Sequence, residues 1–314
     1  MIMFRLALFA ALLIFGTNAC AQQAIKPQTI DLWPGAPPGT GRPSGPEKVG
    51  TSGSATGAVS NVTRPRIELY RPGKPNGKAV LVIGGGGYFR IQIGGAALPT
   101  ARVLLARGYT VGVLYYRLPG DGWNADAPFQ DGQRAMRILA EQAAGLGVRP
   151  DGIGVVGFSA GGHLAAMLAT QGDETLYTPI DAIDRRSAVP AFAGLIYPVI
   201  SMKPPIDTTR TKRELQNLPN FVDRFSAEEK VSARTPPIFL AHAADDEIAD
   251  VDHSLRMFRA MQKAGRPVEL HVFEKGGHSW GVGKPGTTVS VWPSLFIRWL
   301  DNAERLSPGS QAPR

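Results

Sequence analysis

Cysteine is nearly absent from this 314-residue sequence, whose only thiol is Cys20. Cys20 lies in an N-terminal segment that we expect to be cleaved or lipidated. We therefore predict no disulfide, no thiolate metal site and no cysteine nucleophile in the mature chain. The H-E-x-x-H and paired-cysteine spacings typical of zinc sites are also missing, so we expect neither a metal nor another cofactor.

The sequence lacks an N-terminal apolar run long enough to span a bilayer, which takes roughly 20 residues. The run Leu6–Phe15 follows Arg5 and precedes Ala19-Cys20-Ala21, a pattern typical of a cleavable signal peptide. We expect residues 1–21 to be that signal peptide, and the protein to be periplasmic or secreted. The alternative is a lipoprotein with a lipid anchor at Cys20, although the leucine usually found three residues before such a cysteine is missing.

Positive charge is abundant but not concentrated. The formal net charge is +8, yet the densest basic clusters, at 185–186 and 210–213, are short and contain no interleaved aromatic residues. No zinc-finger or RNA-binding motif accompanies them. We predict solvated surface charge and no nucleic-acid partner.

Buried strands alternate with amphipathic helices along most of the chain. This rhythm predicts an α/β protein with a mostly parallel central sheet covered by helices on both faces. We expect strands at Arg66–Tyr70, Ala79–Ile83, Thr110–Tyr115, Ile153–Val156, Ala193–Ile196, Ile238–Ala241 and Val268–Phe273. We expect helices at Leu98–Arg107, Asp131–Ala143, Gly161–Thr170, Ser254–Ala264 and Ser290–Ala303.

These elements predict one catalytic domain over residues 62–303. Residues 22–61 are rich in glycine and proline and are predicted to form an extended, irregular lead-in. Residues 304–314 are predicted to form a flexible tail. The long polar stretch 201–235 is either a flap near the site or an ordinary surface excursion.

The strongest local motif is Gly157-Phe158-Ser159-Ala160-Gly161, between an expected strand and an expected helix. A serine on such a sharp turn is exposed at the sheet edge, and small neighbours let the chain reverse. The turn also directs the positive end of the helix dipole toward the serine. We predict Ser159 as a nucleophile.

A serine nucleophile needs a base, and five histidines are available. His271 lies inside a predicted strand and His163 on a predicted helix, so both are interpreted as structural. His242 ends a strand, and His253 lies in a polar stretch. His278 alone follows the last strand in a glycine-containing loop, and we predict it to be the base.

The acid that orients the base should lie between the serine and the histidine in the chain. Asp245 and Asp246 both follow the predicted strand Ile238–Ala241, and Glu247 is a weaker third candidate. An oxyanion hole should be made by backbone N–H groups of Gly86, Gly87 and Ala160, because glycines let the backbone approach a substrate closely. The glycine run is not followed by the lysine or spacing of a phosphate-binding loop.

The chain resembles the bacterial α/β-hydrolases known as acetyl-xylan esterases or "endo-xylanase B-like" proteins, which are related to the hormone-sensitive-lipase esterases. The resemblance covers most of the chain and rests on GGGGY, YYRLP, DGQRAMRIL, GVVGFSAGGHLAAMLAT, FLAHAADD and VELHVFEKGGHSWG. It implies an α/β-hydrolase fold with Ser159, His278 and one of the two aspartates as the triad. Asp246 is preferred, since hydrolases with a D-x-V/I ending place the acid there, and Asp245 remains the alternative. The chain departs from relatives at Gly84, where lipases have histidine, and at Gly94-Gly95, where glutamate is common.

The resemblance implies hydrolysis of short acyl esters, with O-acetyl groups on carbohydrate such as xylan as the expected substrate. Tyr88 and Trp280 are predicted to line the substrate pocket and limit the acyl length. A general short-chain carboxylesterase remains an alternative, as does a prolyl-oligopeptidase-like peptidase, although the chain has no room for a gating domain. A non-catalytic binding protein on the same fold is the third alternative. The sequence does not predict the oligomeric state.

Overall fold

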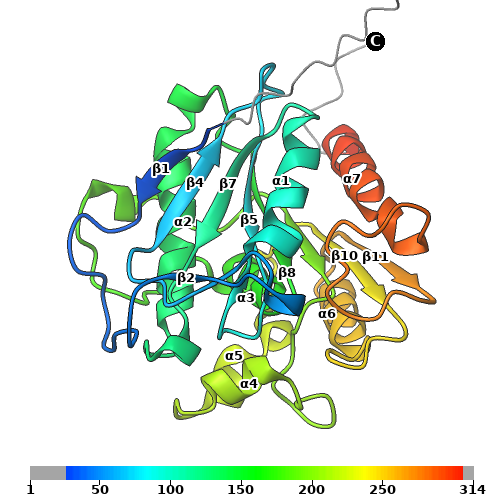
Figure 1. The fold of residues 1–314 in the computed structure, drawn as a ribbon. Helices are drawn as coiled ribbons and strands as arrows, with labels where there is room; N and C mark the ends of the chain where they lie inside the picture. Colours follow the sequence, from blue (N-terminus) through cyan, green and yellow to red (C-terminus); the bar gives the residue numbers. More distant parts are fainter. Residues whose placement is uncertain (1–25, 307–314) are drawn as a thin grey trace, which may run out of the picture.

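The computed structural model describes residues 26–306, so the predicted signal peptide and Cys20 lie outside the described residues. The core is an eight-stranded sheet with the order β1-β4-β7-β5-β8-β9-β10-β11 (Figure 1). β1 and β4 run antiparallel to their neighbours, and the remaining pairs are parallel. The strands are β1 (Gln28–Asp31), β4 (Arg66–Tyr70), β5 (Ala79–Ile83), β7 (Thr110–Tyr115), β8 (Ile153–Phe158), β9 (Ala193–Ile196), β10 (Ile238–Ala243) and β11 (Val268–Phe273).

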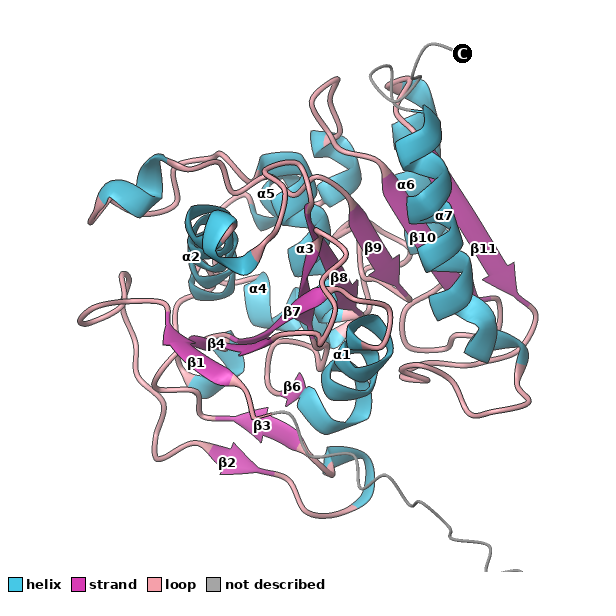
Figure 2. Ribbon diagram, turned by 90° about the horizontal axis from the view of Figure 1, so that it is seen from above, coloured by secondary structure: helices cyan, strands magenta, loops and turns pink. Residues whose placement is uncertain are grey.

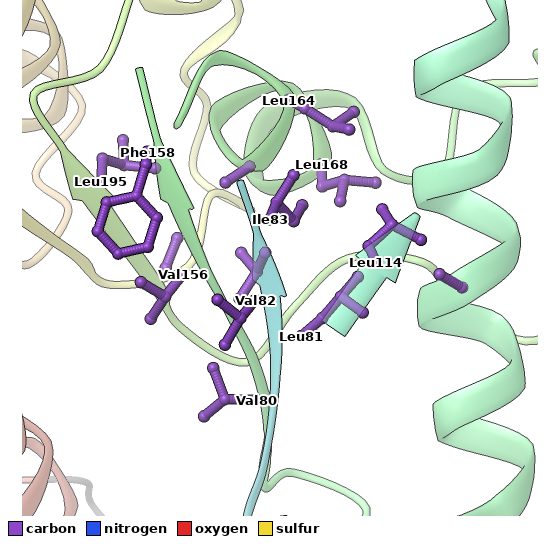
Figure 3. Packing of buried hydrophobic residues seen from close by; sticks show 14 of the residues in the cluster. Val80, Leu81, Val82, Ile83, Leu114, Val156, Phe158, Leu164, Leu168 and Leu195 are labelled. Atoms are coloured by element: carbon purple, nitrogen blue, oxygen red, sulfur yellow. The ribbon is translucent and has the colours of Figure 1, made fainter. Parts of the chain in front are cut away.

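The central strands are apolar on both faces, which is why β5, β7 and β8 are buried along their whole lengths. Successive side chains of a strand point to opposite faces. In Figure 3, Leu81 points with Leu114 toward one face, and Val82 points with Val156 toward the other. Full burial of each such side chain contributes roughly 1.5–3 kcal/mol. This apolar interior holds the carboxyl ends of the strands in fixed positions.

Helices cover both faces of the sheet, as the α/β prediction requires (Figure 2). On one face α1 (Leu98–Leu105) and α7 (Trp292–Leu306) meet over Val156. The opposite face carries α2 (Ala127–Gln142), α3 (Ala160–Gln171) and α6 (Asp252–Lys263). No helix within residues 26–306 has the length and apolar character that a membrane span requires. The helix α7 extends into the predicted tail, and residues 307–314 lie outside the described residues.

The structure corrects the predicted boundary at residue 62. β1, from the predicted lead-in, pairs with β4 in the main sheet, with Asp31 opposite Arg66. β2 (Lys48–Val49) and β3 (Ala58–Ser60) form a second sheet with β6 (Ile91–Gln92). β2 and β3 are too short to show an apolar period, and β1 and β3 pair with strands from distant parts of the chain, β4 and β6. The lead-in is therefore part of the folded domain.

The stretch 201–235 forms two short helices, α4 (Arg210–Leu215) and α5 (Phe221–Phe225), which Figure 1 shows beyond the end of the sheet. Leu215 and Phe225 are fully buried. The segment is thus packed onto the domain rather than being a simple surface excursion.

Candidate active site

Ser159 lies on the turn between β8 and α3 with φ 53° and ψ −119°, a strained backbone conformation that costs of the order of 1–3 kcal/mol. Its N–H donates to the carbonyl of Ile196 at 3.0 Å, which fixes the turn against the neighbouring strand. A Cβ on Gly157 would lie 2.1 Å from the carbonyl oxygen of Gly161, so only glycine fits there. The motif at residues 157–161 therefore forms the strained strand-to-helix turn that a serine nucleophile of this type requires.

The structure brings Ser159, His278 and Asp246 together. His278 lies in the loop after β11, and its Nε2 is 2.8 Å from the Ser159 Oγ. Its Nδ1 is 2.6 Å from Oδ2 of Asp246. The other carboxylate oxygen of Asp246 accepts the N–H groups of Ile248 and Ala249, each at 2.9 Å. The carboxylate, imidazole and hydroxyl thus form one continuous chain of contacts.

Asp246 is held in its ionised form. Burial of its side chain opposes ionisation, but hydrogen bonds from His242 and His278 and from the N–H of Ala249 outweigh that effect and hold the pKa of Asp246 well below its usual range. His242 lies with Nε2 3.3 Å from the carboxylate. An ionised carboxylate orients the imidazole and stabilises the imidazolium that forms when the histidine takes a proton.

Asp245, the alternative acid, does not contact His278. Its Oδ1 accepts the N–H groups of Gly276 at 2.9 Å and Gly277 at 2.8 Å. These hydrogen bonds, that of Gly277 first, lower the pKa of Asp245. The side chain therefore ties the end of β10 to the loop that carries the histidine, and Asp246 is the aspartate within reach of the imidazole.

The glycine loop borders the same cavity as Ser159, with one correction to the prediction. Gly85 and Gly86 line this cavity, whereas Gly87 is not among its lining residues. Gly87 lies against the side chain of Arg210 instead. The chain reverses at Gly86, whose φ is +126° and whose carbonyl accepts two N–H groups from the residues that follow. Gly85 is the glycine that lies next to Ser159, since a Cβ on Gly85 would be 2.8 Å from the Cβ of Ser159.

Ala160, the third predicted oxyanion donor, is not among the residues that line the cavity, but it directly follows one of them, Ser159. Ala160 is the first residue of α3 and is fully buried. The first N–H groups of a helix lack partners within that helix. The Ala160 N–H thus lies beside the serine, at the positive end of the helix dipole.

The predicted role of Tyr88 in the substrate pocket is wrong. Its side chain is fully buried, and its hydroxyl lies 2.9 Å from Nδ1 of His163. The ring also makes edge contacts with Tyr116 and Phe129. The φ of Tyr88 is +61°, a left-handed conformation that turns the side chain into the core behind the glycine loop.

Trp280 is also not among the residues that line the cavity. It packs against Tyr197, with ring centroids 4.6 Å apart, and against Trp292. Tyr197 provides the aromatic wall instead, because it lines the cavity and makes an edge contact with the His278 ring at 4.9 Å. Sequence reasoning missed Tyr197, although its position directly after β9 was a usable signal.

The cavity beside Ser159 has a volume of about 260 Å³ and is closed in part by the N-terminal segment. Gly53, Ser54 and Thr56 line it, and Nε2 of Gln92 donates to the Ser54 carbonyl at 3.0 Å. No sequence signal indicated this wall. A second cavity, of about 320 Å³, lies between α2, α3 and α5 and includes none of the three catalytic candidates.

At Gly94-Gly95, where relatives often have glutamate, there is little room for a side chain. A Cβ on Gly94 would lie 3.0 Å from the Cα of Gly57, and Gly95 lines the cavity with backbone alone. A polar side-chain contact to a substrate would therefore come from other residues of the cavity.

Curated proteins and solved structures that are similar to this chain include esterases. An acetylxylan esterase from Xylanibacter ruminicola is 28% identical over 233 residues, covering 72% of this chain and 45% of that protein. An ethyl acetate hydrolase from Pseudomonas putida is 33% identical over 137 residues, covering 42% of this chain and 40% of that protein. The chain thus spans less than half the length of these curated relatives.

The structure of an acetyl ester-xyloside bifunctional hydrolase from Caldicellulosiruptor lactoaceticus superimposes with a TM-score of 0.73 and 29% identity, covering 90% of this chain and 99% of that one. The predicted α/β-hydrolase fold is thereby confirmed. Residues 67–261 match the family model BD-FAE. This segment includes the glycine loop, the Ser159 turn and Asp246 and extends over more than half of the sequence, so the chain belongs to the BD-FAE family.

Proposed function

We propose that the protein is a serine esterase that hydrolyses short-chain acyl esters, with O-acetyl groups on carbohydrate such as xylan as its main substrate class. The contact of 2.8 Å between the Ser159 Oγ and His278 Nε2 carries the proposal. That contact, together with Asp246 on the far side of the ring, gives the serine a base with a fixed orientation. The activities of the acetylxylan esterase and the ethyl acetate hydrolase relatives support an ester as the substrate.

The geometry is suited to a two-step acyl transfer. His278 Nε2 accepts the hydroxyl proton as the Ser159 Oγ attacks the ester carbonyl, and the carbonyl oxygen becomes an oxyanion. We assign the N–H groups of Gly85, Gly86 and Ala160 as the donors that stabilise it, because Gly85 and Gly86 line the cavity and Ala160 directly follows Ser159. The C–O bond to the alcohol then breaks, and the imidazolium returns its proton to the leaving alkoxide. A water molecule releases the acyl group by the same steps, with the serine as leaving group.

A general short-chain carboxylesterase is the second candidate function, because one of the relatives acts on ethyl acetate. The two candidates share the catalytic machinery and differ in the alcohol. A substrate series separates them. Rates on 4-nitrophenyl acetate, butyrate and octanoate should be measured beside acetate release from acetylated xylan. Efficient acetate release from xylan supports the carbohydrate substrate, whereas turnover of small esters alone supports the general enzyme.

The Ser159→Ala variant tests the nucleophile. We expect ester turnover to fall by several orders of magnitude, to roughly 10³–10⁴-fold over water, with an unchanged circular dichroism spectrum. Reaction of the wild-type protein with a fluorophosphonate probe, and its absence in the variant, provides an independent readout. A variant that retains more than about a tenth of the wild-type kcat would show that another residue is the nucleophile.

We also propose that the protein is exported through the predicted signal peptide at residues 1–21 and acts in the periplasm or outside the cell. The apolar run and the Ala19-Cys20-Ala21 pattern support this proposal. Cell fractionation followed by N-terminal sequencing tests it. A mature N-terminus at Gln22 supports cleavage to a free protein, and a lipid on Cys20 that is lost in Cys20→Ala supports an anchored one.

A further inference from the structure

A positive charge lies beside the candidate nucleophile. Arg90, which directly precedes β6, lines the cavity that contains Ser159. Its side-chain stem lies against Gly86, where a Cβ would be 2.8 Å from the Cγ of Arg90. The guanidinium carbon lies 5.1 Å from the centroid of the Phe89 ring. The arginine is thus built into the wall next to the oxyanion loop.

In the part of the chain that the structure describes, this guanidinium contacts the Phe89 ring but forms no ion pair with a carboxylate. Its Nε is shielded from solvent and makes no hydrogen bond. Among the described residues that line the cavity, Arg90 is the only one that carries a charge; the others are small, amide, hydroxyl or aromatic residues. A substrate that entered this cavity would displace water from the arginine, which costs free energy unless the substrate supplies hydrogen-bond acceptors, and an opposite charge offsets this cost best.

Arg210 provides a comparison within the same region. Its guanidinium stacks on the same Phe89 ring, at 4.5 Å from the centroid. Unlike Arg90, it is paired with a carboxylate, that of Glu214, and it is not among the residues that line the cavity. The two arginines therefore differ in access to the cavity and in pairing, while sharing an aromatic neighbour.

We infer that Arg90 is a specificity-determining residue that recognises a carboxylate carried by the ester substrate. A guanidinium offers N–H groups in a planar fork that matches the two oxygens of a carboxylate. The inference rests on the proposed esterase function and narrows its substrate class to esters with an acidic substituent. The carboxylate is either on the alcohol part, as in an acetylated sugar that bears a uronic acid, or on the acyl part.

Matched ester pairs test the inference. For the alcohol part, the pair is 4-acetoxybenzoate and its neutral methyl ester. For the acyl part, it is mono-4-nitrophenyl succinate and 4-nitrophenyl butyrate. The quantity measured is the ratio of kcat/KM for the anionic ester to that for the neutral ester, in wild type, Arg90→Gln and Arg210→Gln. The two esters of a pair differ in intrinsic reactivity, but this difference is the same whichever protein is assayed. It therefore cancels when the ratios of the three proteins are compared.

We expect Arg90→Gln to lower this ratio by about tenfold, the value of a charge-assisted hydrogen bond, for one of the two pairs. The pair that responds identifies the part of the substrate that carries the carboxylate. Arg210→Gln removes the same net charge and should change the ratio by less than about twofold, because its effect is long-range and screened. Ratios that stay the same in Arg90→Gln for both pairs, or that fall equally in the two variants, overturn the inference.

A binding measurement separates this result from failure of the proposed function. If the wild-type protein turns over none of the four esters, the esterase proposal fails. Titration calorimetry with the products 4-hydroxybenzoate and succinate then still decides the role of Arg90. Binding of one of these anions to wild type that is lost in Arg90→Gln and kept in Arg210→Gln supports recognition of a carboxylate. Absence of binding, or equal binding to all three proteins, overturns it.

Discussion

Replacing Asp246 with asparagine should prevent His278 from acting as a base, because it favours the imidazole tautomer that carries its proton on Nε2. Oδ1 of Asp246 accepts two N–H groups, from Ile248 and Ala249. In Asp246→Asn the amide oxygen must take that position, because an NH₂ group cannot accept them. The NH₂ group is then directed at Nδ1 of His278, where Oδ2 lies 2.6 Å away in the native protein. Nδ1 becomes the acceptor, and the ring proton moves to Nε2.

With its proton on Nε2, the imidazole presents a donor to the Ser159 Oγ and cannot remove the hydroxyl proton. An equivalent loss of the correct tautomer in serine hydrolases lowers kcat by about 10⁴, which corresponds to roughly 5 kcal/mol in the activation free energy. We expect a loss of that order in kcat on 4-nitrophenyl acetate. The KM should change little, because the substitution lies outside the cavity that binds the ester.

Asp245→Asn is the matched control. An asparagine oxygen can still accept the N–H groups of Gly276 and Gly277, so we expect kcat within about threefold of wild type and a small change in Tm. Initial rates and thermal melts of both variants, purified in parallel, provide the comparison. Equal and mild effects of the two substitutions, or a kcat above a tenth of wild type in Asp246→Asn, would refute the tautomer argument.

Tyr88→Phe removes a buried hydroxyl that pairs with His163, so we expect the free energy of unfolding to fall by about 1–3 kcal/mol with an unchanged ratio of acetyl to butyryl turnover. A changed ratio would show that Tyr88 does contribute to acyl-chain selection. Burial lowers the pKa of His163 from 6.5 to about 4, so the unfolded chain binds a proton that the folded protein does not, and stability is lost as the pH falls from 6.5 toward 4. His163→Gln should therefore lose less stability over that range, by up to roughly 3 kcal/mol, in urea unfolding at pH 7 and pH 4.5; parallel losses in the two proteins would contradict this. Gly85→Ala would place a Cβ 2.4 Å from the Phe158 carbonyl oxygen and 2.8 Å from the Cβ of Ser159. We expect ester turnover to fall at least about tenfold, and wild-type rates would show that the glycine loop does not border the reaction.

Ser159 and His278 could be predicted from the sequence because each carries a local signal. Ser159 lies between a strand pattern and a helix pattern, and the small neighbours that its turn requires are visible in the sequence. His278 follows the last strand in a loop with two glycines. Both residues follow strands of the parallel sheet, and the carboxyl ends of parallel strands lie at one edge of the sheet, which is where the structure brings the two side chains together.

The choice between Asp245 and Asp246 as the acid depends on which of the two adjacent side chains the backbone directs toward His278. Both follow β10, and sequence cannot show which of two adjacent side chains turns toward the histidine. In the structure, the N–H groups of Ile248 and Ala249 bind Asp246, whereas those of the histidine loop bind Asp245. The assignment to Asp246 from the sequence rested on resemblance to other hydrolases, not on a local physical signal.

The residues that line the pocket were predicted poorly, because side-chain direction depends on backbone dihedral angles and on packing against residues far away in the sequence. Tyr88 was placed in the pocket by its position after the glycine loop, but its positive φ reverses the side-chain direction. Trp280 was placed there by its position after His278, but it packs against Tyr197 and Trp292. Neither dihedral angle nor ring packing is encoded in a short motif.

The wall formed by residues 53–56 is held differently from the catalytic groups. Ser159 and His278 follow strands of the main sheet, whereas this wall lies between β2 and β3, and Gly53, Ser54 and Thr56 are exposed. Its fixed points are polar ties: the N–H of Gly94 donates to the Gly57 carbonyl at 2.9 Å, and Gln92 bonds to Ser54. Segments with little apolar burial open at a lower free-energy cost than the core does. Substitutions at 53–56 can therefore change which esters the cavity accepts without weakening the sheet that holds the nucleophile and its base.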